Sequence, residues 1–213
     1  MGTDDRFKNS FILSLLFVCL LWWVKLGELF LDWDLSVFGV LPMHSQGLIG
    51  IFAAPLIHGS LNHIFSNTLP TLILGTLLLY GYPKSRWWVL LIVWLGSGLG
   101  VWLFAREATH IGASGLSHGM FFFLLVASIL RRDKRSVAIM MIVFLLYGSM
   151  TMTIFPREPN ISFEYHFFGA IAGSLCAFIF WRRDPKPVEK KYQWEGTEDD
   201  DPLIGDEWQD KSD

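Results

Sequence analysis

The stretch Gly112–Arg135, GASGLSHGMFFFLLVASILRRDKR, holds the pattern that decides the fold. It begins with small and polar residues, continues through a long apolar run and ends in a basic cluster. From Ala108 to Leu130 the chain carries no Asp, Glu, Lys or Arg. A helix needs roughly 20 mostly apolar residues to cross the hydrocarbon core of a bilayer. We therefore expect a transmembrane helix here, followed by a turn rich in positive charge.

The rest of the chain repeats this pattern. Charged residues are also missing from five other stretches: Asn9–Val24, Leu35–Pro83, Trp87–Ala105, Ser136–Pro156 and Tyr165–Trp181. Glycine, proline and polar residues interrupt the first half of the longest one, so we expect a membrane-associated loop there, followed by one helix near His58–Tyr80. The sequence thus predicts an all-α, polytopic membrane protein with six spans, and seven spans is the alternative.

The basic residues favour six spans. With six, one side of the membrane holds fourteen Lys and Arg residues, and the other holds only Lys25, Arg106 and Arg157. A seventh crossing would move the cluster Arg131–Arg135 to the outside together with the C-terminus. Because short cytoplasmic loops are enriched in Lys and Arg, we expect both termini to be cytoplasmic.

Composition excludes an ordinary soluble domain and divides the chain in two. The 213 residues are 52% hydrophobic and only 17% charged, with a mean hydropathy of +0.40, whereas soluble domains are about one quarter charged. Residues 184–213 hold 11 acidic and 4 basic side chains, and residues 1–183 hold 9 and 13. We expect a membrane domain over residues 1–183 and a disordered acidic tail over residues 184–213.

Polar residues within the spans are the candidates for function, because ionisable side chains are costly in a membrane. Under the six-span topology, the second, fourth and sixth helices run in the same direction from the outer side. His63 and Asn67 lie four residues apart on one face of the second helix, Ser114 lies at the start of the fourth, and His166 lies about one turn into the sixth. These side chains should meet at similar depth.

This set of residue types can perform acyl transfer. A histidine beside a serine can act as general base and then as general acid. The backbone N–H of Ser114, the ring of His63 and the amide of Asn67 could stabilise an oxyanion. We expect no Asp or Glu within these three helices at this depth, so Ser114 and His166 would act as a dyad without a carboxylate.

Small residues should let the fourth and sixth helices approach closely. Gly115 and Gly119 recur at an interval of four in the fourth helix, as Gly169 and Gly173 do in the sixth. Such spacing is typical of close helix packing in membranes. His166 lies on the same stripe as the two glycines of the sixth helix, which would bring it toward Ser114.

Three motifs resemble those of the rhomboid intramembrane serine proteases. Gly112-Ala113-Ser114-Gly115 looks like that family's GxSG motif, and the segment from His166 to Gly173 looks like its HxxGxxxG motif. The segment from His58 to Asn67 matches the family's HxxxxHxxxN motif in the second helix. The resemblance covers the whole six-helix body, in order and topology.

The resemblance implies a function and a role for each residue. Ser114 would be the nucleophile and His166 the base, His63 and Asn67 would assist the oxyanion, and Gly112 would shape the turn before the nucleophile. His58, Gly115, His118, Gly169 and Gly173 would support the site. Such a protease cleaves single-span membrane proteins near the outer ends of their transmembrane helices, and it needs no metal or other cofactor and no nucleic acid. With no organelle-targeting segment, the chain is expected in a bacterial inner membrane.

Two departures from the family pattern stand out. His118 occupies the position where rhomboids often have Tyr or Phe, so a second imidazole could stack on His166 or hydrogen-bond to it. The first loop lacks the Trp-Arg pair of many members and has Pro42-Met43 in that region.

Two alternatives remain open from the sequence. A metal or proton transporter could use His63, His118 and His166. An inactive rhomboid-like protein could bind transmembrane segments without cleaving them, although such proteins usually lose the Ser or the His.

Overall fold

The computed structural model describes residues 3–156 and 161–186, and this part of the chain is helical. The long helices are α1 (Thr3–Leu31), α3 (Leu61–Gly81), α4 (Arg86–Phe104), α5 (Ser114–Arg131), α6 (Lys134–Tyr147) and α7 (Phe163–Phe180). The short ones are η1 (Leu35–Phe38), η2 (Ser45–Leu48), α2 (Gly50–Ala53), η3 (Ala54–Leu56) and η4 (Gly148–Thr151), which continues α6. Among the described residues, six helices are long and apolar enough to cross a membrane, which confirms the six-span prediction.

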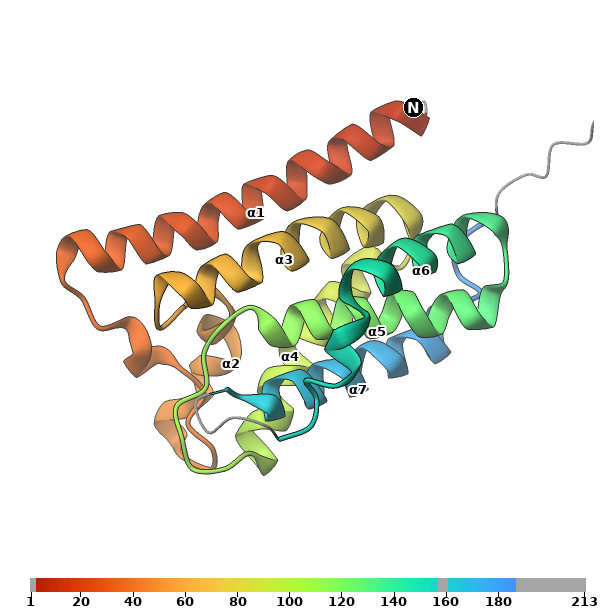
Figure 1. Ribbon diagram of the computed structural model, residues 1–213. Coiled ribbons are helices and arrows are strands. Elements are labelled where there is room, and N and C mark those ends of the chain that lie inside the picture. Colours follow the sequence, from red (N-terminus) through yellow and green to blue (C-terminus); the bar gives the residue numbers. More distant parts are fainter. Residues whose placement is uncertain (1–2, 157–160, 187–213) are drawn as a thin grey trace, which may run out of the picture.

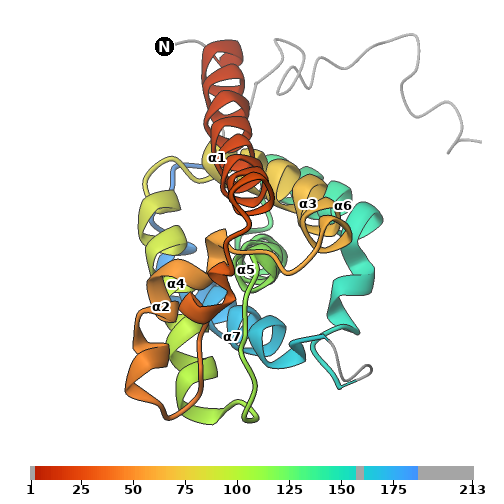
Figure 2. The same cartoon turned by 90° about the vertical axis from the view of Figure 1, so that its left-hand side faces the viewer.

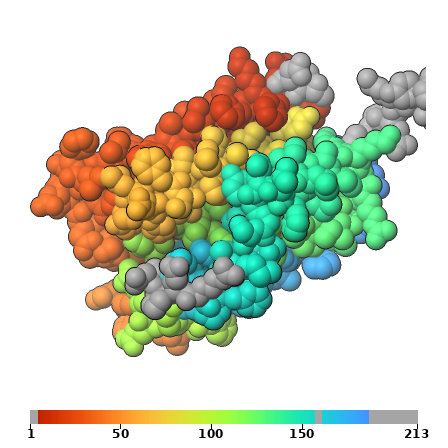
Figure 3. Space-filling model, viewed as in Figure 1, coloured from red at the N-terminus to blue at the C-terminus, as the bar shows by residue number. Residues whose placement is uncertain are grey.

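The bundle is arranged around α5. Viewed along the helices, α5 lies in the middle, with α3, α4, α6 and α7 around it and α1 on the outside (Figures 1 and 2). The packing of α1 is mainly against α3, and α3 also contacts α6, so α1, α3 and α6 lie side by side on the face seen in Figure 3. This arrangement makes α5, which carries Ser114 at its start, the most enclosed of the spans.

The outer surface suits a hydrocarbon environment. Large apolar side chains point outward along the spans, including Trp23 on α1, Phe104 on α4 and Leu145 on α6, each at least 74% exposed. A soluble protein rarely exposes such a continuous apolar surface. The interior holds Leu74, Leu78, Phe121 and other fully buried side chains around α5.

Some helix boundaries differ from the sequence predictions. The helix expected near His58 begins at Leu61, because the Ser60 hydroxyl caps it by accepting the N–H of His63 at 3.1 Å. His58 therefore lies in the loop before α3. The fifth span, expected to extend to Pro156, leaves the α conformation at Tyr147 and continues as the tighter η4.

Helices α5 and α7 touch backbone to backbone. A Cβ atom added at Gly169 would collide with the main chain of Gly115, and one added at Gly173 would collide with that of Gly119. Only glycine permits this separation, and the prediction of a close approach between these helices is confirmed. Because the contact begins at Gly115, it holds the first turn of α5 against the first turns of α7.

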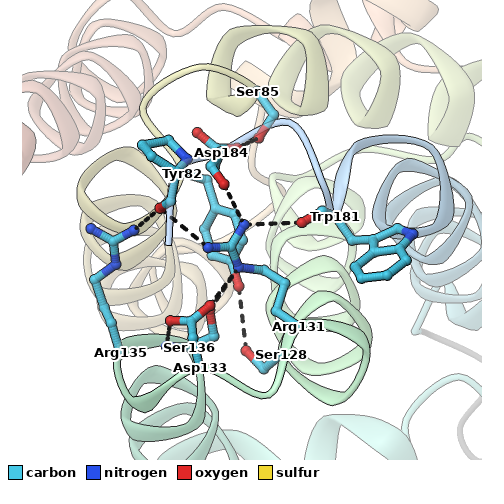
Figure 4. Close-up of polar contacts among 10 residues, drawn as sticks. Tyr82, Ser85, Ser128, Arg131, Asp133, Arg135, Ser136, Trp181 and Asp184 are labelled. Carbon is cyan, nitrogen blue, oxygen red and sulfur yellow. Dashed lines mark hydrogen bonds and ion pairs between the residues drawn. The ribbon is translucent and has the colours of Figure 1, made fainter. Parts of the chain in front are cut away.

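A polar network joins the helices at the opposite end of the bundle, where α1 begins and α7 ends. We call this the basic end, because Lys84 and Arg86 lie at the turn from α3 to α4 and Arg131 is the last residue of α5. Arg131 is 3% exposed, and its guanidinium donates to Asp133 Oδ2 and Ser136 Oγ, both at 2.9 Å, and to the carbonyl of Trp181 at 2.9 Å (Figure 4). One side chain therefore joins the ends of α5, α6 and α7.

The residues just after α7 complete this network. The carbonyl of Asp184 accepts from Arg131 at 2.8 Å, and its carboxylate accepts the hydroxyl of Ser85 (Figure 4). The same carboxylate also accepts the N–H of Lys84 at 2.6 Å. The first residue of the expected acidic tail thus contacts the turn between α3 and α4. The tail from residue 187 onward lies outside the described residues.

Replacing Arg131 should destabilise the fold. Arg131→Ala would leave the Asp133 carboxylate without its cationic partner and the carbonyls of Trp181 and Asp184 without this donor, and removing one partner of a buried ion pair costs about 3–5 kcal/mol. We expect a clearly lower midpoint of thermal unfolding in detergent. Lys134→Ala, at an exposed position of the same turn, is the control and should change the midpoint little. Equal midpoints for the two variants would contradict this role for Arg131.

Candidate active site

Gly112 sets the direction of the chain into α5. Its φ is +114°, a left-handed backbone conformation that side chains with a Cβ rarely adopt, and its N–H donates to the carbonyl of Ala54 at 2.9 Å. Ser114 is then the first residue of α5. The N–H groups of a helix's first turn have no partner within the helix, so those of Ser114 and Gly115 can stabilise negative charge.

His63 lies directly against this turn. A Cβ atom placed on Gly112 would be 2.6 Å from His63 Nε2, so the absence of a side chain at Gly112 is what admits the imidazole. Asn67 follows one turn later on the same face of α3, is 5% exposed, and donates one amide hydrogen to the His63 carbonyl at 3.0 Å. The second amide hydrogen of Asn67 takes no part in that bond and can be donated to another acceptor.

His58 supports the same turn from the loop before α3. Its ring packs edge-on against the ring of His63, with centroids 5.0 Å apart, and its Nε2 accepts the N–H of Ala113 at 3.4 Å. Burial, together with repulsion from His63, lowers the pKa of His58 to about 4. The ring is therefore neutral at pH 7, with its proton on Nδ1, because Nε2 acts as an acceptor.

His166 is oriented by a main-chain carbonyl. Its Nδ1 lies 3.0 Å from the carbonyl oxygen of Thr153, in the connection between α6 and α7. A carbonyl oxygen only accepts, so Nδ1 carries the proton, and Nε2 of a neutral ring keeps its lone pair for another donor. This is the tautomer that a general base needs.

His118 joins the two halves of the site. Its ring stacks on that of His166, with centroids 3.9 Å apart and planes within 7° of parallel. Its Nδ1 donates to the carbonyl of Ser114 at 2.8 Å, and its Nε2 lies 2.7 Å from the Thr153 hydroxyl. That hydroxyl is also 3.0 Å from the carbonyl of Met150, which competes for its one proton.

Ser114 and His166 are thus neighbours through His118 and through the glycine contact between α5 and α7. No hydrogen bond between Ser114 Oγ and His166 Nε2 is formed among the described residues. Catalytic hydrogen bonds are often long in structures without substrate and shorten when substrate binds.

The structure corrects the prediction that the three helices carry no carboxylate at this depth. Helix α7 begins at Phe163, so Glu164 lies in its first turn, 6% exposed and two residues before His166. Its Oε1 lies 3.5 Å from Arg106 Nε. Since His166 Nδ1 faces the Thr153 carbonyl, Glu164 does not take the position of a third triad member.

Several supporting residues were not predicted. Thr153 belongs to none of the three motifs, and its contacts with His118 and His166 depend on where the chain turns after η4. Ala54, which accepts the N–H of Gly112, gives no signal as an apolar residue in an irregular loop. His110 is 2% exposed, and its backbone pairs with that of Val40 in both directions at 2.9 Å, which joins the first loop to the segment before α5.

The pKa of His58 predicts a pH dependence of stability. A histidine whose pKa is about 4 when folded and near 6.5 when unfolded favours the folded state less as the pH falls through that range, because the unfolded chain binds the proton first. The free energy of unfolding should therefore decrease between about pH 6.5 and about pH 4. His58→Gln keeps an acceptor for Ala113 and should lose less stability over this range in chemical denaturation. Identical pH profiles for the two proteins would refute the assignment.

Comparisons with known proteins agree with this architecture. The family model described as the Rhomboid domain matches residues 45–183. Uncharacterized proteins of Mycobacterium bovis and Mycobacterium tuberculosis are each 34% identical over 174 residues, covering 78% of this chain and 72% of the relative. One from Mycobacterium leprae is 31% identical over 183 residues, covering 82% and 72%. With the motifs, six candidate spans and the domain match in agreement, the chain belongs to the rhomboid family.

Proposed function

We propose that the protein is an intramembrane serine endopeptidase that uses Ser114 and His166 as a dyad. One observation carries the proposal: Nδ1 of His166 faces the carbonyl of Thr153, while the ring stacks on His118, one turn from Ser114. The carbonyl supplies the orientation that a carboxylate supplies in a triad.

Acylation follows from this arrangement. Ser114 Oγ attacks the scissile carbonyl of a substrate and gives its proton to Nε2 of His166. The resulting imidazolium returns that proton to the leaving amine as the C–N bond breaks, which leaves an ester on Ser114. Nδ1 keeps its proton and its bond to Thr153 throughout.

Deacylation uses the same residues in the same roles. A water molecule gives a proton to His166 Nε2 and attacks the ester carbonyl, and the C–O bond to Ser114 then breaks as His166 returns the proton to Oγ. No metal or other cofactor takes part in either half of the reaction.

The oxyanion would form at the start of α5. The N–H groups of the first turn of α5, the His63 ring beside Gly112 and the second amide hydrogen of Asn67 would donate to it, as their places near this turn support. Removing one such donor in other serine proteases costs about 10²–10³ in kcat. Gly112 makes room for the ring of His63, and His58 holds the N–H of Ala113.

The substrates would be single-span membrane proteins, cleaved near the outer ends of their transmembrane helices. The site lies at the end of the bundle away from the basic end (Figure 1). If the basic end is cytoplasmic, as the distribution of Lys and Arg indicates, both termini are cytoplasmic and the site faces the outer half of the bilayer. A bacterial inner membrane suits this orientation.

The transporter and the inactive binding protein remain the competing functions. Both ring nitrogens of His118 and one of His166 already have hydrogen-bond partners, which favours a fixed catalytic arrangement over a set of free metal ligands. Within residues 3–156 and 161–186, no group of three His, Cys, Asp or Glu side chains is placed to bind a metal ion.

Substitution of the dyad should abolish cleavage. Purified protein in liposomes should cleave a tagged single-span substrate, whereas Ser114→Ala and His166→Ala should lower the rate by at least about 10³-fold, since they remove the nucleophile and the base. Ser66→Ala, at an exposed serine near the site end of α3, is the matched control and should cleave normally. Cleavage by Ser114→Ala at the wild-type rate would refute the nucleophile. No cleavage by any form, with unfolding excluded, would favour the binding protein.

The side chain of Thr153 should matter less than its carbonyl. Thr153→Val keeps the carbonyl that faces His166 but removes the hydroxyl that faces His118, a contact of about 1.4 kcal/mol, so kcat should fall about tenfold with little change in KM. Thr153→Ser keeps the hydroxyl and should retain most of the activity. Equal rates for the two variants would show that the contact between Thr153 and His118 does not position the base.

A further inference from the structure

A large apolar cavity lies on the side of the bundle away from α6. It has a volume of about 520 Å³ and is lined by residues of α1 and α4 at its sides and of α3 and α5 at its floor. We call it the α1–α4 groove. Leu13 and Ser14 contribute to one wall, Trp87 and Leu91 to the other, and Met120 to the floor.

The groove is open toward the surrounding membrane. Leu13 and Leu91 on its rim are 41% and 49% exposed, and both belong to helices that are candidate spans. Its lining is almost entirely apolar, so a polar ligand would find few hydrogen-bond partners there. An empty groove would also lose the dispersion contacts that a ligand could make with its walls. A hydrocarbon chain is the chemistry that fits.

The end of the groove nearest the basic end is positively charged. Arg86 donates from Nη1 to the carbonyl of Leu79 at 2.9 Å, and its guanidinium lies 5.3 Å from the centre of the Trp87 ring. Leu79 and Trp87 both line the groove, so this guanidinium lies at its margin. Arg86 Nε is buried and has no hydrogen-bond partner.

A second guanidinium approaches from α1. Arg6 precedes Leu13 of the groove by seven residues, close to two full turns, so the two lie on one stripe of α1. Phe7 packs against Tyr80, with ring centroids 5.5 Å apart, which brings the first turns of α1 beside the turn of α3 that holds Leu79. The Nε of Arg6 is also buried without a partner, and within the described part of the chain neither Arg6 nor Arg86 forms an ion pair with a carboxylate.

We propose that the α1–α4 groove binds an anionic glycerophospholipid, with one acyl chain along the groove and its phosphate at Arg6 and Arg86. Charge complementarity selects the headgroup, because guanidinium groups bind phosphate through charge-assisted hydrogen bonds and basic pockets between transmembrane helices recognise anionic lipids. Lys84, exposed in the turn before α4, adds positive charge at the same end.

The floor of the groove connects this lipid to the candidate site. Leu116 lines the groove and lies two residues after Ser114, on the opposite side of α5. Behind it, Thr71 and Ser117 hydrogen-bond at 3.0 Å and join α3 to α5. An acyl chain in the groove therefore packs against the back of the helix turn that carries Ser114.

Native mass spectrometry of the full chain tests the proposal. The protein in neutral detergent is titrated with dioleoyl phosphatidylglycerol, with dioleoyl phosphatidylcholine and with oleate. We expect one molecule of phosphatidylglycerol to bind at least about tenfold more tightly than phosphatidylcholine or oleate, since only it combines paired acyl chains with a phosphodiester headgroup of net negative charge.

Variants locate the site. Arg6→Gln and Arg86→Gln should each weaken phosphatidylglycerol binding about tenfold and change phosphatidylcholine binding much less, because the choline cation offsets the charge of its phosphate. Leu91→Trp and Leu13→Trp, at opposite rims, should each block binding by filling the groove. Lys134→Gln, an exposed cation at the basic end but on α6, is the matched control and should bind like the wild type. Thermal unfolding without lipid identifies any variant that fails to fold.

Three results would overturn the proposal. Equal binding of the two phospholipids, unaffected by either arginine substitution, would refute the headgroup assignment. Undiminished binding by folded Leu91→Trp and Leu13→Trp would refute the groove. Oleate binding as tightly as phosphatidylglycerol would show that the ligand is a fatty acid.

Discussion

The backbone contact between α5 and α7 is the constraint on which the candidate site depends. Gly169 and Gly173 lie so close to Gly115 and Gly119 that no side chain fits between them. This contact places the first turn of α5 beside the first turn of α7, so that His118 stacks on His166. In a bilayer, helix association gains little from the hydrophobic effect, and close packing of small residues takes its place.

Around this contact the protein fixes three of the imidazoles, those of His58, His63 and His166, each by a different partner. His63 lies over the glycine turn at Gly112, His58 accepts the N–H of Ala113, and His166 donates to the carbonyl of Thr153. Each partner is a main-chain group or depends on the absence of a side chain. The geometry of the candidate site at these three rings therefore relies on the path of the backbone more than on further polar side chains, which suits a site within a membrane, where unpaired polar groups are costly.

Much of the fold and of the candidate site could be predicted from the sequence. The number of spans follows from the lengths of the uncharged stretches and from the position of basic clusters such as Arg131–Arg135. The close approach of α5 and α7 follows from glycines at intervals of four. The grouping of Ser114, His63 and His166 follows from helix direction, since residues at the starts of three parallel helices lie at similar depth.

The other features of the fold and of the candidate site depend on contacts between residues far apart in the sequence, and no periodic sequence pattern indicates such contacts. Thr153 reaches His166 only because α6 gives way to η4 and the chain then turns back over the site. Glu164 is separated from Arg106 by more than fifty residues, and the uncharged-stretch rule placed it just outside the last span, although α7 begins before it. The α1–α4 groove arises because α1 packs mainly on α3 and leaves α4 uncovered, which no local pattern indicates.

The most direct measurement is the location of covalent labelling by a fluorophosphonate. The wild-type protein in liposomes would be treated with the probe, digested and examined by tandem mass spectrometry. If Ser114 is the nucleophile and His166 its base, a single modified residue should be found, Ser114, and His166→Ala should not be labelled. Labelling at another serine, or undiminished labelling of Ser114 in His166→Ala, would contradict the account.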